Sequence, residues 1–212
     1  MRALLLLFIL ALPVLAEAFL SKPLNLRAVV PGKVYRSTDL CVLTPEQDTT
    51  LKALGLRTII DLRSEPEVKS FGPDRPVAAK VVSISLPPLA GAEGYQEYVR
   101  EKKVFGQLFH LLAQEYTYPV LFHCHRGKDR TGVLAALLED LLGVPREEVY
   151  LNYLQSTQVG PGPENDVQRE WLDVVFDAVD KAGGIKPYLE SCGVTAEEQA
   201  RLVTILTRPR DK

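Results

Sequence analysis

The chain has 212 residues, of which 46% are hydrophobic and 8% aromatic, enough for one packed domain and too many for a disordered protein. The formal net charge is −2, so overall charge gives no reason to expect a nucleic acid or a membrane surface as a partner. Any attraction for anions must therefore be local.

Residues 1–18 have the pattern of a secretory signal peptide. A basic residue precedes an apolar run at 3–15, and an A-x-A cleavage pattern stands at 16–18, so the mature chain is predicted to start at Phe19. An uncleaved membrane anchor is the alternative, but the run is shorter than the roughly 20 residues of a membrane-spanning helix. We therefore expect an exported protein, periplasmic or secreted, with no stable membrane span after cleavage and one domain at 19–212.

The first half of this domain alternates between strand and helix patterns. Thr44 opens a capping box with proline at the first helical position, and Gly55 is placed to stop that helix. The runs of β-branched and apolar residues are typical of strands, whereas apolar residues beyond Tyr95 recur on one helical face. We therefore expect strands at 34–36, 57–62 and 80–85, and helices at 44–54 and 95–114.

The second half is mostly helical. A strongly apolar helix follows the last strand and is stopped by Gly143, and Thr195 opens a second capping box. We expect a strand at 120–123, and helices at 131–142, 145–155, 164–181 and 195–208. The alternation predicts one α/β domain with a small central sheet and a helical C-terminal half.

Residues 123–132, HCHRGKDRTG, carry the predicted chemistry. A chain that turns sharply from strand into helix aims backbone N–H groups at one point, and the helix N-terminus adds positive charge there. This predicts an anion site of phosphate size, with Gly127 at the tightest turn and Arg130 forking two phosphate oxygens. The same field favours the thiolate of Cys124 as a nucleophile, and Thr131 can donate its hydroxyl to that sulfur.

Cysteine, five residues, arginine and then serine or threonine is the pattern of the protein tyrosine phosphatase superfamily, which this loop resembles. The GKDRTG run at 127–132 resembles more narrowly the bacterial tyrosine and dual-specificity phosphatases that also act on phosphoinositides. Segments 31–40, 60–67 and 183–194 resemble the same group in the same order. The resemblance implies the compact cysteine-phosphatase fold, with a four- or five-stranded, mostly parallel sheet flanked by helices. It also implies a two-step hydrolysis through a thiophosphate on Cys124.

The general acid of the superfamily is normally an aspartate on a loop upstream of the cysteine, and this chain departs from that pattern. No aspartate lies between Asp74 and Asp129. Because the loop aspartate is implicated in catalysis in the GKDRTG group, the resemblance points to Asp129 first and to Glu93 second. The alternatives are a brace for Arg130 and a solvated loop residue, respectively.

Extra cations in the loop bear on the substrate. His125, Arg126 and Lys128 accompany Arg130, and a single phosphate needs only the arginine. Several cations suit several phosphates, so we expect a phosphorylated protein or an inositol phosphate as substrate. Idle surface charge is the alternative for His125 and Arg126, whereas for Lys128 the resemblance implies a role in phosphoinositide binding.

Other cysteine chemistries are the competing interpretations. His123, Cys124 and His125 are adjacent, but neighbouring residues on a strand point to opposite faces, and no cysteine pair has zinc-ligand spacing. We expect neither a metal nor a cofactor. A rhodanese-like sulfurtransferase and a non-catalytic module that binds phosphorylated ligands remain as alternatives, although the RTG ending at 130–132 favours phosphate.

The two remaining cysteines are Cys41 and Cys192. An odd number of cysteines in an exported protein leaves at least one free thiol. Cys41 and Cys192 could form a disulfide if they meet in space, but we expect both to be buried small hydrophobic residues.

Overall fold

The computed structural model describes residues 24–158 and 166–209. The predicted signal peptide at 1–18 lies outside the described residues and stays a prediction. Within the described ranges, no helix is both long enough and apolar enough to cross a membrane.

The centre of the protein is a sheet in the strand order β1-β2-β5-β3-β4. β1 pairs antiparallel with β2, and the other neighbouring strands pair in parallel. This confirms the expectation of an α/β fold with a mostly parallel sheet, and gives five strands within the described residues. The strands are β1 (Arg27–Val30), β2 (Val34–Ser37), β3 (Thr58–Asp61), β4 (Lys80–Ser83) and β5 (Val120–His123).

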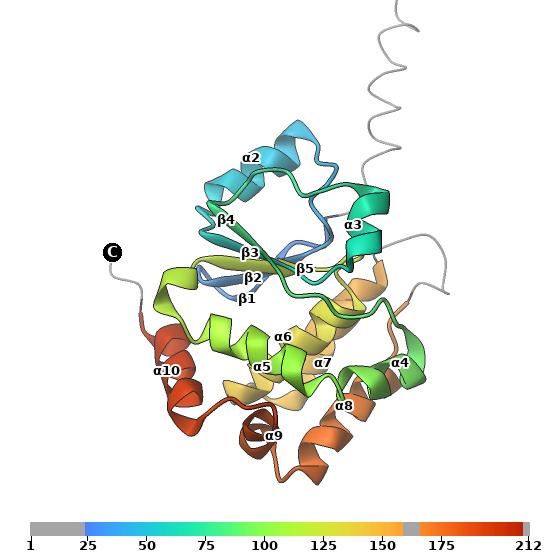
Figure 1. The fold of residues 1–212 in the computed structure, drawn as a ribbon, viewed down its shortest axis with the longest axis vertical. Coiled ribbons are helices and arrows are strands. Elements are labelled where there is room, and N and C mark those ends of the chain that lie inside the picture. The colour runs from blue at the N-terminus through green and yellow to red at the C-terminus, as the bar shows by residue number, and fades with distance from the viewer. Residues whose placement is uncertain (1–23, 159–165, 210–212) are drawn as a thin grey trace, which may run out of the picture.

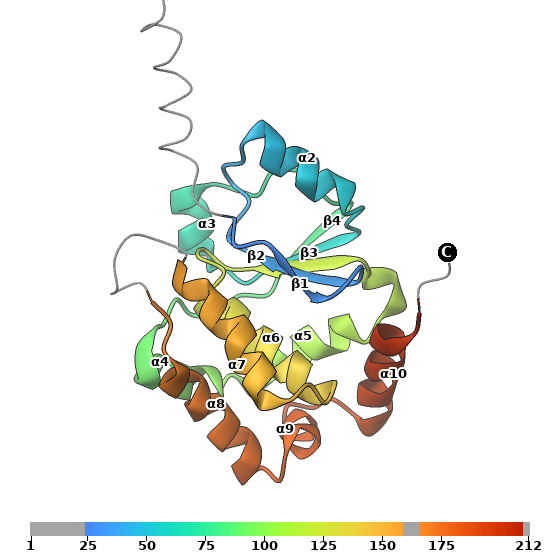
Figure 2. The same ribbon diagram turned by 180° about the vertical axis from the view of Figure 1, so that it is seen from behind.

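Helices cover both sides of the sheet, unequally (Figure 1). Of the described helices, α2 (Pro45–Ala53) and α3 (Glu65–Phe71) lie on one side. The helical C-terminal half lies on the other side, as Figure 2 shows from behind. That side holds α4 (Gly91–Tyr98), α5 (Lys102–Leu112), α6 (Asp129–Leu141), α7 (Arg146–Leu154), α8 (Arg169–Lys181), α9 (Ile185–Ser191) and α10 (Ala196–Thr207). Two short 3₁₀ turns, η1 (Glu115–Thr117) and η2 (Gln155–Gln158), complete the described elements.

The alternation of side chains along the central strands divides the core in two. Ile60 and Phe122 point into the larger cluster with the C-terminal helices, whereas Ile59 and Leu121 point into the smaller cluster beneath α2. Successive side chains of a strand face opposite sides, so a strand covered on both faces reads as a continuous apolar run. That is why the central strands could be predicted from composition.

The predicted helix at 95–114 is wrong, because the structure has two helices there. α4 ends at Tyr98, and α5 begins at Lys102 after a turn in which the amide of Glu101 donates to the carbonyl of Tyr98 at 3.0 Å. The charged run at 100–103 separates the two apolar faces, so one helical stripe does not continue across it. Only the existence of helical structure was predicted correctly.

Several boundaries and elements also differ from the prediction. α6 begins two residues before the expected 131, and α8 begins at Arg169, after coil at 166–168. The short elements β1, α3 and α9 were not predicted. α3 carries a capping box in which Glu67 accepts from the backbone and the hydroxyl of Ser64, at 2.8 and 2.9 Å. That signal was present in the sequence.

The strand register brings three chain segments together at one edge of the sheet. His123 lies beside Ser37 on one flank and beside Asp61 on the other. Residues that follow β2, β3 and β5 therefore meet at the carboxyl ends of the parallel strands, where ligands of open α/β sheets bind.

Candidate active site

The junction between β5 and α6 forms the floor of a pocket of about 170 Å³. The Cys124 side chain is 2% exposed, at the start of the loop, and Arg130 lies in the first turn of α6. The pocket is lined by Glu67, Pro88, Leu89, Ala90, Cys124, His125, Arg126, Asp129 and Arg130. Five of the predicted site residues therefore meet at one cavity, at the N-terminal, positive end of a helix.

Gly127 is fixed at the point where the loop passes β2. Its φ of +65° lies in the left-handed region, and a Cβ there would come within 2.2 Å of the carbonyl oxygen of Ser37. The Gly127 carbonyl accepts hydrogen bonds from Arg36 and Asn25, both at 3.0 Å. Glycine is therefore needed at this turn because the loop backbone lies too close to β2 for a side chain.

Arg130 is held in place by Glu67, a partner that was not predicted. Nη1 and Nη2 of Arg130 donate to the two carboxylate oxygens of Glu67 at 2.7 and 2.6 Å. Nη1 also lies 3.3 and 3.2 Å from the carbonyls of Leu62 and Leu86. Although burial acts in the opposite direction, hydrogen bonds from Arg130 and Ser64 lower the pKa of Glu67 to about 2. The guanidinium is therefore pre-oriented by a carboxylate that stays ionised.

His125 is tied to neighbouring segments. Its Nδ1 lies 2.5 Å from a carboxylate oxygen of Asp39, and its ring stacks on Phe71 with centroids 3.9 Å apart. Phe71 is 46% exposed, at the end of α3. His125 lines the pocket, but Asp39 and Phe71 set its orientation.

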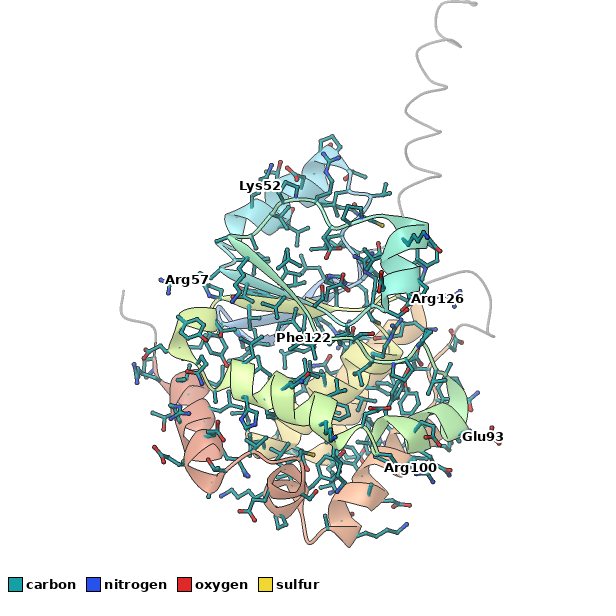
Figure 3. The ribbon with its side chains drawn as sticks, viewed as in Figure 1. Lys52, Arg57, Glu93, Arg100, Phe122 and Arg126 are labelled. Carbon is teal, nitrogen blue, oxygen red and sulfur yellow. The ribbon has the colours of Figure 1, made fainter. Side chains whose placement is uncertain are left out.

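The two basic residues on either side of Gly127 have different environments. Arg126 is exposed and lines the pocket at the carboxyl edge of the sheet, opposite the edge marked by Arg57 (Figure 3). Lys128 is 3% exposed and does not belong to the pocket lining. Burial and the charge of Arg126 lower the pKa of Lys128, while the carboxylate of Asp129 opposes that shift. Of the predicted substrate-binding cations, Arg126 is therefore the one exposed at the mouth.

The two candidate acids lie in different places. Asp129 lines the pocket and accepts a hydrogen bond from the Tyr95 hydroxyl at 3.1 Å. Burial raises the pKa of Asp129, against the lowering effects of Lys128 and Tyr95. Glu93 is exposed in the first turn of α4, points away from the body of the protein in Figure 3 and is not part of the pocket lining. The geometry therefore favours Asp129.

The upstream segment at 88–90 forms an apolar wall of the pocket instead of supplying an acid. The Tyr98 hydroxyl holds the segment at Leu89, where it accepts from the backbone amide at 3.0 Å and donates to the carbonyl. A Cβ at Gly94 would lie 2.8 Å from the Leu89 side chain, so α4 packs directly on this wall.

Thr131 does not make the expected hydrogen bond to the sulfur. Its hydroxyl is buried and has no hydrogen-bond partner among the described residues. An unsatisfied buried hydroxyl costs about 1–3 kcal/mol. Its predicted contact with Cys124 is therefore absent from this state of the protein.

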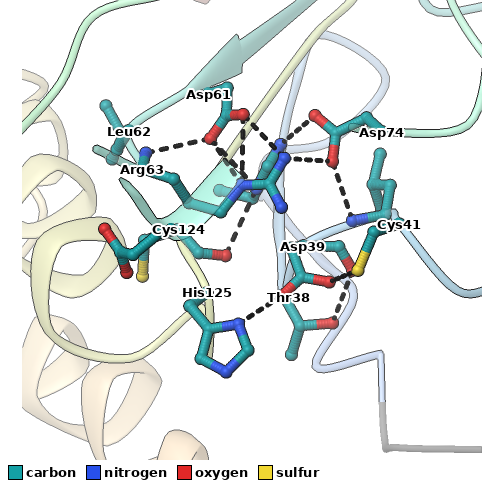
Figure 4. Close-up of polar contacts among 12 residues, drawn as sticks. Thr38, Asp39, Cys41, Asp61, Leu62, Arg63, Asp74, Cys124 and His125 are labelled. Atoms are coloured by element: carbon teal, nitrogen blue, oxygen red, sulfur yellow. Dashed lines mark hydrogen bonds and ion pairs between the residues drawn. The ribbon is translucent and has the colours of Figure 1, made fainter. Parts of the chain in front are cut away.

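A buried ion-pair network lies next to the loop (Figure 4). Nη2 of Arg63 lies 2.8 Å from Asp61 and 2.9 Å from Asp74, and Nε2 of His123 lies 2.8 Å from Asp74. Asp61, Asp74 and His123 are close enough together to be considered as metal ligands. The Arg63 guanidinium, however, already lies between the two carboxylates as their cation, so we interpret the three residues as structural.

All three cysteines lie in the described part of the chain, and no disulfide joins any two of them. Cys192 is buried, as expected, but Cys41 is only half-buried and donates to Asp39 at 2.7 Å. A disulfide between these two cysteines is thus absent.

The chain is similar in sequence to proteins of one known family. The sequence profile of the tyrosine phosphatase family matches residues 23–208. The chain is 33% identical over 156 residues to the tyrosine-protein phosphatase of Nostoc commune, and this alignment covers 65% of this chain and 53% of that protein. It is 28% identical over 179 residues to the triple specificity protein phosphatase PtpB of Mycobacterium tuberculosis, and this alignment covers 63% of this chain and 64% of that protein.

The chain thus spans about half to two thirds of the length of these two curated relatives. Among solved structures, the core catalytic domain of the PP-IP phosphatase SIW14 from S. cerevisiae is 18% identical, with a TM-score of 0.48. That likeness covers 76% of this chain and 88% of the solved chain.

Proposed function

Since this chain belongs to the tyrosine phosphatase family, we propose that it is a phosphatase that hydrolyses phosphoric monoesters, with Cys124 as its nucleophile. The observation that carries the proposal is that Cys124, Arg130 and Asp129 line one pocket at a strand-to-helix turn. A sulfur nucleophile, a forked cation and a raised-pKa carboxyl at one small cavity are the parts that phosphoryl transfer needs.

In the first step, the Cys124 sulfur attacks phosphorus in line with the ester oxygen. The sulfur–phosphorus bond forms as the bond to the leaving oxygen breaks, and that oxygen takes a proton from Asp129. The backbone amides at the start of α6 and the Arg130 guanidinium neutralise the three equatorial oxygens. In the second step, water gives a proton to Asp129 and displaces the sulfur, which releases inorganic phosphate.

Thr131 fits the second step. A buried hydroxyl without a partner is available to donate to the sulfur as it leaves phosphorus with its electron pair. We therefore assign Thr131 to the breakdown of the thiophosphate.

Aryl phosphates, including phosphotyrosine, are the proposed substrate class. The wall at Pro88, Leu89 and Ala90 gives the pocket an apolar side that suits a ring. Arg126 at the mouth supports inositol phosphates as the second candidate, because a further phosphate group would meet its charge there.

The test is phosphate release by the purified protein beside Cys124→Ser, with a reductant and a chelator present. The substrates are a phosphotyrosine peptide, a phosphoserine peptide, phosphatidylinositol phosphates and inositol hexakisphosphate. Cys124-dependent release establishes the phosphatase, and loss of inositol phosphate activity alone in Arg126→Ala supports the second substrate class. No release above the Cys124→Ser background on any substrate would instead favour a module that only binds phosphorylated ligands.

Export of the protein is part of the proposal. The pattern at 1–18 supports cleavage before Phe19 and activity outside the cytoplasm. Intact-mass analysis of the exported protein tests this, because a mature chain that retains residues 1–18 would contradict it.

A further inference from the structure

A chain of two tyrosine hydroxyls ends on the carboxyl group of Asp129. The Tyr95 hydroxyl donates to Oδ1 of Asp129 at 3.1 Å, and it lies 2.6 Å from the Tyr153 hydroxyl. Tyr95 is fully buried and Tyr153 is 1% exposed. The three residues come from α4, α6 and α7, so the chain exists only in the folded domain.

The packing of the two tyrosine rings fixes the positions of their hydroxyls. A Cβ at Gly132 would come within 2.9 Å of the Tyr153 ring, so that ring lies directly on α6, three residues after Asp129. The Tyr95 ring packs edge-on against the ring of Tyr153, with their centroids 6.3 Å apart. Its centroid lies 5.9 Å from that of the Trp171 ring. The hydroxyls are therefore positioned by their rings.

Both hydroxyls keep their protons throughout the working pH range. Burial, followed by the charge of Asp129, raises the pKa of Tyr95 well above its ordinary value, and burial raises that of Tyr153 as well. Between the two chemical steps, after it has given up its proton, Asp129 is ionised and can only accept hydrogen bonds. The one proton of Tyr95 then goes to Oδ1, and Tyr153 must donate to the oxygen of Tyr95.

We propose that Tyr95, supported by Tyr153, is a positioning residue that reserves Oδ1 of Asp129 as an acceptor and so presents the catalytic proton on Oδ2. This inference rests on the proposed function. When the ester bond breaks, the leaving oxygen takes the proton from Oδ2, and the new carboxylate is stabilised by the hydrogen bond from Tyr95. The attacking water later returns a proton to Oδ2, which restores the starting state.

The dependence of rate on the leaving group tests this assignment. A poor leaving group needs the proton, whereas p-nitrophenolate leaves with little help. We expect Tyr95→Phe to lower kcat/KM for an alkyl phosphate about tenfold, and for p-nitrophenyl phosphate less than about threefold. Tyr153→Phe should show the same pattern with smaller losses. Asp129→Asn serves as the reference for complete loss of the acid.

The pH profile of kcat provides an independent readout. Burial raises the pKa of Asp129, while the charge of Lys128, the Tyr95 hydrogen bond and the charge of Arg130 lower it. Removal of the Tyr95 hydrogen bond should therefore move the basic limb of the profile to higher pH. The matched control is Tyr188→Phe, because that buried hydroxyl donates to the carbonyl of Val99 at 3.1 Å and does not line the pocket. Its profile and leaving-group dependence should match those of the unaltered protein.

Equal losses on all leaving groups in Tyr95→Phe, with an unmoved basic limb, would overturn the inference and leave the phosphatase proposal intact. Phosphate release that does not depend on Cys124 would contradict the proposed function itself. The two failures are therefore distinguishable in one set of assays.

Discussion

Gly127 shows how one backbone position sets the shape of the loop. Alanine at a left-handed position costs about 1–2 kcal/mol, and at Gly127 its Cβ would also strike the Ser37 carbonyl. We expect Gly127→Ala to lose activity at least about a hundredfold, because the loop must move away from β2. Gly143→Ala is the matched control, since Gly143 has φ +75° but open space around it.

The two glycine variants are compared by urea unfolding and by kcat/KM. Gly143→Ala should be destabilised by the backbone cost alone and keep its activity. Unchanged activity in Gly127→Ala would mean that the close approach to Ser37 does not shape the site.

The ion pair between Glu67 and Arg130 predicts a pH dependence of stability. The pKa of Glu67 is lowered from 4.5 to about 2, so the folded state binds fewer protons than the unfolded state between these values. The contribution of the pair is fully present above pH 4.5 and is lost as pH falls towards 2. Glu67→Gln should be less stable by about 2 kcal/mol at neutral pH, with the difference shrinking in this window.

Urea unfolding of the unaltered protein and of Glu67→Gln, between pH 7 and pH 2.5, measures the difference in their free energies of unfolding. A gap that stays constant as the pH falls would show that the charge of Glu67 is not what holds Arg130.

At the scale of elements, α4 supports the pocket wall at 88–90. Tyr98 fixes this segment through the amide and the carbonyl of Leu89. Tyr98→Phe should raise hydrogen exchange at the Leu89 amide about fivefold, the equivalent of about 1 kcal/mol. It should also lower kcat/KM for aryl phosphates about tenfold.

Tyr118→Phe is the control for this variant, because the Tyr118 hydroxyl donates to the carbonyl of Leu112 and its ring lines a separate pocket at the other edge of the sheet. If both variants exchange Leu89 at the same rate as the unaltered protein, Tyr98 does not anchor the wall.

The elements also show what the sequence could predict. Capping boxes and glycine stops predicted α2 and α10, and apolar runs predicted the central strands, because these signals are local. The break between α4 and α5 was missed because the spacing of apolar residues shows that a segment is helical, but not where one helix ends and the next begins. β1 was not predicted, although it is as long as the other strands; it lies at the edge of the sheet, and none of its residues is fully buried.

The site shows the same division. Cys124, Gly127 and Arg130 could be predicted because their chemistry lies within one short loop. Glu67 and Tyr95 could not be assigned roles, since they lie 63 and 34 residues from the groups they bind. Only the strand register and the packing of α4 bring them to the pocket.

At the scale of the whole molecule, the pocket draws on both layers of helices. Glu67 comes from α3 on one side of the sheet, whereas Tyr95 comes from α4 on the other. We expect activity and structure to be lost together in urea, because no single layer retains the site. Trp171 is the only tryptophan of the chain and packs near Tyr95, so its fluorescence reports the unfolding of the larger layer.

That experiment compares the urea midpoint of activity with the midpoint of Trp171 fluorescence. Coincident midpoints are expected. Activity lost well before the fluorescence changes would mean that α3 and the loop unfold independently of the C-terminal helices.

The most direct test of the central claim is to identify the phosphorylated residue during turnover. The protein is mixed with p-nitrophenyl phosphate, quenched in acid within milliseconds, digested and analysed by mass spectrometry. We predict phosphate on the peptide that contains Cys124, and its accumulation in Thr131→Ala, where the second step is slowed. Phosphate on another residue, or rapid turnover without any phosphorylated peptide, would contradict the assignment of Cys124 as the nucleophile.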